Sequence, residues 1–137
     1  FCAVFSDFHL FRKLYGIPLP DVQTAATWME EMEINGKTEI LHDGYSTVDL
    51  SSGQKKRLAL LSALLEAKPI LILDEWAADQ DPHFRRKFYD ELLPRWKAEG
   101  KTIIAVTHDD RYFDMADRRF HLEEGQLRDQ SEIPTNG

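Results

Sequence analysis

The chain has 137 residues, of which 42% are hydrophobic and 30% are charged, and its formal net charge is −7. This length and composition are typical of one globular domain with a real core and exclude an intrinsically disordered chain. The acidic balance argues against a nucleic-acid surface, and no apolar run approaches the roughly 20 residues that span a bilayer. The single cysteine, Cys2, excludes an internal disulfide and fits a reducing compartment.

The N-terminal part is expected to contain one strand and one helix. Residues 1–5 have the pattern of a strand, and they carry neither an initiator methionine nor a signal peptide, so we expect the chain to be a piece of a longer protein. A break at residues 16–20 precedes a helix that Asp21 caps and that runs to about Glu33. Four residues at helical spacing form its packing face: Ala25, Trp28, Met29 and Met32.

A second helix is predicted from about Ser52 to Ala67, after a loop over residues 40–50. It opens on the turn Leu-Ser-Ser-Gly-Gln at residues 50–54. Such a turn can hold a phosphate, because backbone N–H groups and the positive end of the helix dipole face the anion. Taken alone, such a turn is more often an ordinary helix cap. The helix is apolar on more than one face and should be largely buried, with the basic residues 55–57 on its exposed side.

The C-terminal half is expected to hold two buried parallel strands joined by a helix. Residues 70–73 and 102–106 are short apolar runs, and a helix that Asp81 caps separates them and runs to about Glu99. A crossover of this length predicts an α/β fold with a parallel sheet. A short helix toward residue 116, a hairpin around residues 124–125 and a loose tail from residue 130 complete the chain.

Both predicted strands end in polar residues, where open α/β sheets bind their ligands. Asp74 and Glu75 follow the first strand, and His108 follows the second. One carboxylate could lie in the shell of Mg²⁺ while the other faces an attacking water, or both could simply be solvated. His108 could be an ordinary loop histidine. A zinc site with Asp109 and Asp110 lacks the usual ligand spacing.

Taken in order, these motifs closely resemble the C-terminal part of the ATP-binding domain of ABC transporters. Residues 50–54 match the L-S-G-G-Q signature with Ser52 in place of the first glycine, and Asp74 and Glu75 match the Walker B aspartate and the catalytic glutamate. His108 matches the switch histidine, and residues 78–81 match the D-loop only at their end. Two stretches, residues 5–11 and 74–82, resemble the cyclic-peptide and siderophore-peptide exporters of Gram-negative bacteria.

The resemblance implies a partial P-loop NTPase fold in three parts. The Q-loop and a helical signature subdomain would cover about residues 6–67, the core from Walker B to the H-loop about residues 68–129, and a loose tail residues 130–137. The signature turn would contact the γ-phosphate of ATP held by a second subunit. Its residues are Ser51, Ser52, Gly53 and Gln54.

The resemblance also implies roles for single residues. Asp74 would orient Mg²⁺ through water, and Glu75 would polarise the attacking water. His108 would contact the γ-phosphate, and Asp81 would couple the two sites of a dimer. Ser6 stands where the family has its Q-loop glutamine, so metal contact and coupling at that position are expected to differ.

The implied partners are a second ATP-binding domain in a homodimer and a transmembrane domain of the same polypeptide, at the cytoplasmic face of the bacterial inner membrane, with no nucleic acid. No G-x-x-x-x-G-K-[ST] motif occurs in the sequence. We therefore expect the 137-residue chain to bind ATP poorly, to hydrolyse none measurably, and to self-associate through the edge of an incomplete sheet.

Two alternatives remain open at this point. One is an ABC ATPase that acts in DNA repair or translation rather than transport, although the acidic balance and the lack of a basic stripe weigh against nucleic-acid contact. The other is an interaction module with a degenerate nucleotide site, which the absent phosphate-binding motif favours and the intact Asp74, Glu75 and His108 disfavour.

Overall fold

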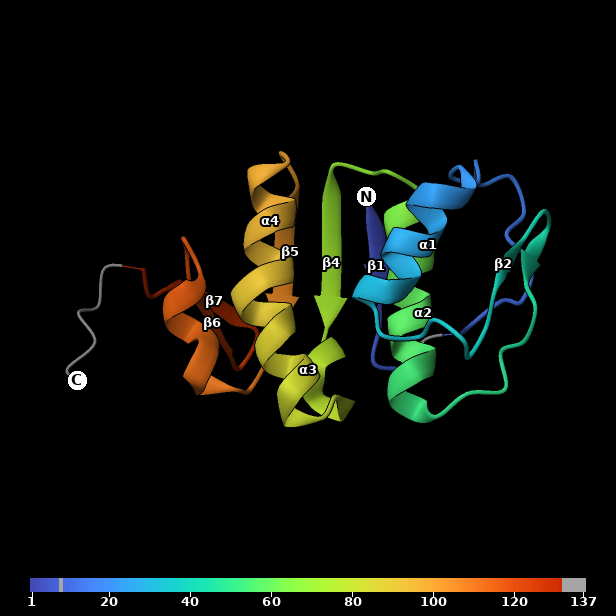
Figure 1. Cartoon of the computed structure of the whole chain (residues 1–137). Helices are drawn as coiled ribbons and strands as arrows, with labels where there is room; N and C mark the ends of the chain where they lie inside the picture. Colours follow the sequence, from blue (N-terminus) through green and yellow to red (C-terminus); the bar gives the residue numbers. More distant parts are fainter. Residues whose placement is uncertain (8, 132–137) are drawn as a thin grey trace. The chain divides into compact units, whose positions relative to one another are not determined.

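The structure, a computed structural model, describes residues 1–7 and 9–131 (Figure 1). Phe8, within one of the exporter-like stretches, and residues 132–137, most of the expected tail, lie outside the described residues. The chain forms two compact units that divide between Thr107 and His108, and each is described by itself. The division expected near residues 67 and 130 stays a prediction.

The first unit is built on a parallel sheet of three strands in the order β1-β4-β5. The strands are β1 (Cys2–Val4), β4 (Ile70–Asp74) and β5 (Thr102–Val106). Val4 pairs with Leu73, and Leu73 pairs with Ala105, so the three carboxyl ends meet at one edge of the sheet. The predicted α/β fold with a parallel core is confirmed.

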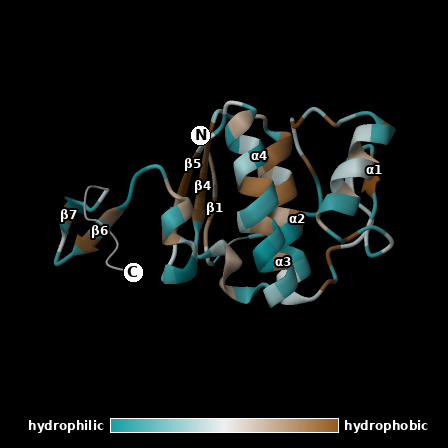
Figure 2. Ribbon diagram, turned by 60° about the vertical axis from the view of Figure 1, so that its left-hand side comes forward, coloured by the Kyte–Doolittle hydropathy of each residue, from teal (hydrophilic) through white to brown (hydrophobic). Residues whose placement is uncertain are grey.

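The two faces of this sheet differ in how well they are covered. The helices of the first unit lie on one side of the strands (Figure 2), and Leu71 and Leu73 on that face are buried. The prediction that the strand over residues 102–106 is buried is wrong, because Ile104 and Val106 are 50% and 49% exposed. Both strands are apolar on two faces, but the described helices of this unit cover only one.

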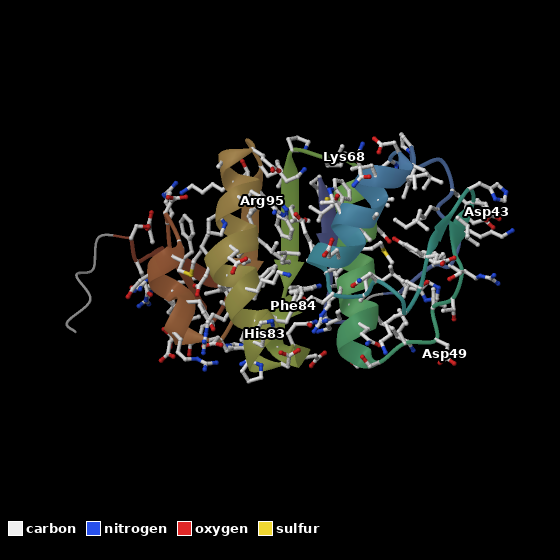
Figure 3. The ribbon with its side chains drawn as sticks, in the orientation of Figure 1. Asp43, Asp49, Lys68, His83, Phe84 and Arg95 are labelled. Atoms are coloured by element: carbon white, nitrogen blue, oxygen red, sulfur yellow. The ribbon has the colours of Figure 1, made fainter. Side chains whose placement is uncertain are left out.

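Helix α1 (Val22–Glu31) follows the capping pattern that its sequence predicts. The Asp21 carboxylate accepts the Thr24 amide hydrogen at 2.9 Å, and Met29 and Met32 are buried. The helix ends two residues earlier than expected, before Glu33 adopts a positive φ of 55°. Arg95 of α4 (Leu93–Ala98), labelled in Figure 3, donates two hydrogen bonds of 2.7 and 2.8 Å to the Glu31 carboxylate, which fixes this end of α1.

The segment expected to be a loop over residues 40–50 contains a small antiparallel hairpin. Strand β2 (Ile40–Leu41) pairs with β3 (Gly44–Tyr45). Tyr45 is 1% exposed, and its hydroxyl lies 2.7 Å from Ser62 Oγ of α2 (Ser52–Leu65). Each strand has only two residues, too few to show an alternating pattern, so the sequence reads as a loop.

Helix α2 (Ser52–Leu65) is the most buried helix of the first unit that the structure describes. Leu58, Leu60 and Leu61 are each 0% exposed. The helix contacts both β1 and the short 3₁₀ segment η1 (Trp76–Asp79) that follows β4. The predicted start and the predicted burial are both confirmed.

The crossover from β4 to β5 is one continuous helical run with a π-helical middle. It comprises α3 (Pro82–Lys87), η2 (Phe88–Leu92) and α4 (Leu93–Ala98). Pro94 has no N–H to donate and its ring would clash with the carbonyl four residues earlier, and the wider π turn just before it relieves that clash. The predicted helix over residues 81–99 is therefore present but not uniform.

The second unit contains a 3₁₀ helix and a hairpin. The helix is η3 (Asp110–Met115), and strands β6 (Phe120–Glu123) and β7 (Gln126–Asp129) pair in antiparallel register. Glu124 and Gly125 both have positive φ, at 50° and 76°, as a two-residue hairpin turn requires. The predicted hairpin is confirmed. Over both described units, every helix is too short or too polar to cross a bilayer.

Candidate functional site

The turn that opens α2 is held by a reciprocal capping box. Ser51 Oγ accepts the Gln54 amide hydrogen at 3.3 Å, and Gln54 Oε1 accepts the Ser51 amide hydrogen at 3.1 Å. These bonds satisfy two of the N–H groups at the start of the helix. Ser52 and Gly53 are the first two residues of the helix, and no carbonyl within the helix can accept from their N–H groups. The turn can therefore present two N–H donors and the helix dipole to an anion.

Gly53 allows a second segment to lie directly against this turn. Its carbonyl accepts a hydrogen bond of 3.1 Å from Gln80 Nε2. A Cβ at Gly53 would lie 3.4 Å from the carbonyl oxygen of Asp79 and 3.5 Å from Gln80 Oε1. The structure thus brings the turn at residues 50–54 against Asp79 and Gln80.

Asp74 and Glu75 stand where β4 ends, and both are partly exposed. Glu75 has a left-handed backbone, with φ 53° and ψ 30°, and its amide donates to the Val106 carbonyl at 2.9 Å. Ser6 lies in an exposed turn two residues beyond β1, at the same edge of the sheet. His108 begins the second unit and is described apart from these residues.

The expectation that residues 55–57 lie on the exposed side of α2 is wrong for two of them. Lys56 is 3% exposed and Arg57 is 9% exposed. A cation is buried only where partners offset its lost hydration. Lys56 Nζ lies 2.8 Å from Asp79 Oδ2 and donates to the Glu75 carbonyl at 3.4 Å.

Arg57 binds three groups and stacks on a fourth. Its guanidinium donates to Gln80 Oε1 at 2.8 Å, to Asp81 Oδ2 at 2.9 Å and to the Met32 carbonyl at 3.4 Å. It also lies 3.9 Å from the ring centre of Phe84 on α3, the aromatic residue labelled in Figure 3. A sequence signal for this burial existed, since a helix that is apolar on several faces leaves little solvent face for three adjacent cations.

Each carboxylate oxygen of Asp81 accepts a hydrogen bond from its own chain, while the side chain stays 54% exposed. It accepts the Phe84 amide hydrogen at 2.9 Å, as the cap of α3, and it also accepts from Arg57. The Phe84 N–H is the main cause that lowers the pKa of Asp81, and the Arg57 charge acts in the same direction. A role for Asp81 in coupling two subunits stays a prediction.

Asp74 is the residue of this site that could hold a magnesium ion. Within residues 1–7 and 9–131, no group of three or more His, Cys, Asp or Glu side chains is arranged to hold a metal. Magnesium needs only one or two carboxylates when phosphate oxygens and water fill its other positions, so Asp74 fits that role. The Asp109 carboxylate of the alternative zinc site binds Arg111, at 2.8 and 2.7 Å.

Comparison with known families gives two overlapping matches. The sequence model described as "ABC transporter" matches residues 3–78, more than half of the chain. A model described as "AAA domain, putative AbiEii toxin, Type IV TA system" matches residues 43–114. Both spans include residues 50–54 and the acids Asp74 and Glu75.

Curated relatives and a solved structure agree with this assignment. The chain is 54% identical over 129 residues to ATP-binding protein SyrD of Pseudomonas syringae pv. syringae, covering 91% of the chain and 23% of SyrD. It is 34% identical over 112 residues to the glutathione/L-cysteine transport system ATP-binding/permease protein CydD of Bacillus subtilis (strain 168), covering 77% of the chain and 19% of CydD. The chain thus spans less than a quarter of these two relatives.

The structural neighbour supports the fold alone. It is the ATP-binding cassette MJ0796, solved as a dimer in a post-hydrolysis state bound to ADP and Pi, with a TM-score of 0.70 and 21% identity over 93% of this chain and 61% of that chain. Its fold agrees with the parallel core and with the family match over residues 3–78. The chain belongs to the ABC transporter family and is part of an ATP-binding domain.

Proposed function

We propose that this chain supplies the signature, Walker B and switch segments to the ATP-hydrolysing domain of an exporter, whose cargo is a cyclic or siderophore-type peptide. The observation that carries the proposal is the contact between two segments of the chain: the turn at residues 50–54 and the segment that follows Glu75. The turn that opens α2 offers anion-binding amides, and the segment that follows Glu75 packs on that turn through Gln80 and Gly53. The peptide cargo rests on the exporter-like sequences of residues 5–11 and 74–82.

In this proposal, the acids after β4 and the turn that opens α2 have different parts in hydrolysis. Glu75 would accept the proton of the attacking water, and Asp74 would hold Mg²⁺ through water, where the ion would neutralise phosphate charge. The amides of Ser52 and Gly53, within the turn from Ser51 to Gln54, would bind the γ-phosphate of ATP on a second copy of the domain.

Three further roles complete the proposal. His108 would contact the γ-phosphate, and Asp81 would couple the two sites across the dimer. The turn at Ser6 would face a transmembrane domain of the same polypeptide at the cytoplasmic face of the bacterial inner membrane. The 137-residue chain alone would hydrolyse no measurable ATP, because its sequence has no phosphate-binding G-x-x-x-x-G-K-[ST] loop.

The test measures ATP hydrolysis by the full-length protein that carries this chain. Glu75→Gln should lower kcat by about 100-fold or more, the usual worth of a general base, and should leave ATP binding intact. Ser52→Arg should abolish both hydrolysis and export while sparing ATP binding. Glu99→Gln, an exposed residue at the end of α4, is the matched control and should change nothing. Unchanged turnover in Glu75→Gln would overturn the role proposed for Glu75, and a full-length wild type without any turnover would favour an interaction module instead.

A further inference from the structure

Lys56 is a buried lysine, and its ammonium group contacts the short segment from Glu75 to Asp79 that follows β4. It is 3% exposed, and its Nζ lies 2.8 Å from Asp79 Oδ2. The same Nζ donates to the backbone carbonyl of Glu75 at 3.4 Å. Burying an ammonium group is costly unless its donors are satisfied, so this placement ties one strong cation to a short segment.

A second bond joins the same two segments through the main chain of Lys56. Its carbonyl accepts the indole hydrogen of Trp76 at 2.9 Å. Trp76 is 2% exposed, and its ring centre lies 4.4 Å from that of Phe88 in η2. Lys56 therefore binds residue 75 through its side chain and residue 76 through its backbone, and the packed indole makes the second bond rigid.

Glu75 needs such support, because its backbone is in a region that L-residues avoid. Its φ of 53° and ψ of 30° are left-handed, a conformation that is strained for a residue with a Cβ. Its amide is bound by the Val106 carbonyl at 2.9 Å, and its carbonyl accepts from Lys56 and, at 3.3 Å, from the Ala78 amide. This backbone conformation sets the direction in which the Glu75 carboxylate leaves the chain.

We propose that Lys56 is a positioning residue for the Glu75 carboxylate and acts through the Glu75 backbone. The inference rests on the proposed role of Glu75 in hydrolysis. Within the described residues, the hydrogen bonds and the ion pair of Lys56 involve Glu75, Trp76 and Asp79. Its loss should therefore misdirect Glu75 without weakening the binding of nucleotide. A purely structural lysine would instead change the fraction of folded protein and leave the turnover of each folded molecule unaltered.

The first test compares variants of the full-length protein by ATPase kinetics, with activity expressed per folded molecule. Lys56→Met should lower kcat by about 10- to 100-fold, the effect of a small misplacement of a catalytic group, with KM for ATP unchanged within about twofold. Lys56→Arg keeps a charged donor and should recover most of the loss. Lys55→Met is the matched control, since it removes the neighbouring, less buried lysine of the same helix.

The second test asks whether Lys56 acts through Glu75. The double variant Lys56→Met with Glu75→Gln should be no slower than Glu75→Gln alone, because a carboxylate that is absent cannot be misplaced. If kcat of the double variant falls by the product of the two single-variant factors, the inference is overturned. If Lys56→Met fails to fold, Trp76→Phe removes the other bond while keeping an aromatic ring, and should lower kcat about threefold at constant KM. An unchanged kcat in Trp76→Phe would then overturn the inference.

These outcomes separate the two proposals. A Glu75→Gln variant that loses hydrolysis beside a fully active, folded Lys56→Met variant would overturn the inference and leave the proposed function standing. A Glu75→Gln variant that keeps hydrolysis would overturn both, because there would be no catalytic carboxylate for Lys56 to position.

Discussion

At the scale of single residues, two adjacent cations of α2 are buried where groups from distant parts of the chain bind them. The partners of Lys56 and Arg57 lie 19 to 25 residues away along the chain. A helix that is apolar on several faces indicates that little solvent face is left for these cations, but only the packed structure shows which groups bind them. The order of residues 50–54, Asp74, Glu75 and His108, by contrast, can be read from the sequence, because each motif is contiguous.

Arg57 provides a test of how much such a buried cation stabilises the fold. Arg57→Met should lower the free energy of unfolding by about 2–4 kcal/mol, because Gln80 and the Met32 carbonyl lose their donor and Asp81 loses its charge partner. Urea unfolding of the 137-residue chain measures the change. Arg86→Met, an exposed arginine on α3, should change stability by less than about 0.5 kcal/mol. Equal effects from the two variants would contradict the role given to Arg57.

At the scale of elements, helix starts and strand positions were predictable, and the irregular pieces were not. Asp21, Ser51 and Asp81 each cap the helix that their sequence context predicts. The β2–β3 hairpin could not be predicted, because strands of two residues are too short to show an alternation of apolar and polar side chains. The π segment before Pro94 could not be predicted either, because the proline marks a disturbance without specifying the form that the backbone takes.

The hairpin predicts a specific response to alkaline pH through Tyr45. Burial raises the pKa of Tyr45 to about 12, above the value near 10 of an unfolded tyrosine. Because the folded state favours the neutral phenol, Tyr45 contributes its full stability below pH 10. That contribution is lost as the pH rises toward 12. Tyr45→Phe lacks the bond to Ser62, so at pH 8 it should be less stable by about 1 kcal/mol. As pH rises through 10 to 11.5, this gap should close, because only the wild type loses stability at this position.

Urea unfolding at a series of pH values measures that gap. Tyr15→Phe is the matched control, since Tyr15 is 77% exposed, and its curve should run parallel to the wild type. A constant gap between Tyr45→Phe and the wild type up to pH 11.5 would show that the phenol is not held in its neutral form.

At the scale of the whole molecule, the first unit has one covered and one uncovered sheet face. The sequence predicts both strands as buried, since an apolar run cannot report what is available to cover it. In the described residues, β5 ends the sheet on one side, and Ile104 and Val106 stay half exposed. An apolar edge strand with unpaired backbone groups is a template for pairing with another chain.

We therefore expect the 137-residue chain to self-associate through β5 as its concentration rises. Ile104→Lys places a charge on the uncovered face of this edge strand and should shift the sedimentation profile toward monomer, because a lysine must stay hydrated and so opposes pairing. Val22→Lys is the matched control, since Val22 is 88% exposed but lies on α1, away from the sheet, and its profile should match the wild type. A wild-type chain that sediments as a monomer across the whole concentration series would contradict this expectation. The half-exposed Ile104 and Val106 of β5 would then be tolerated in contact with water without pairing to another chain.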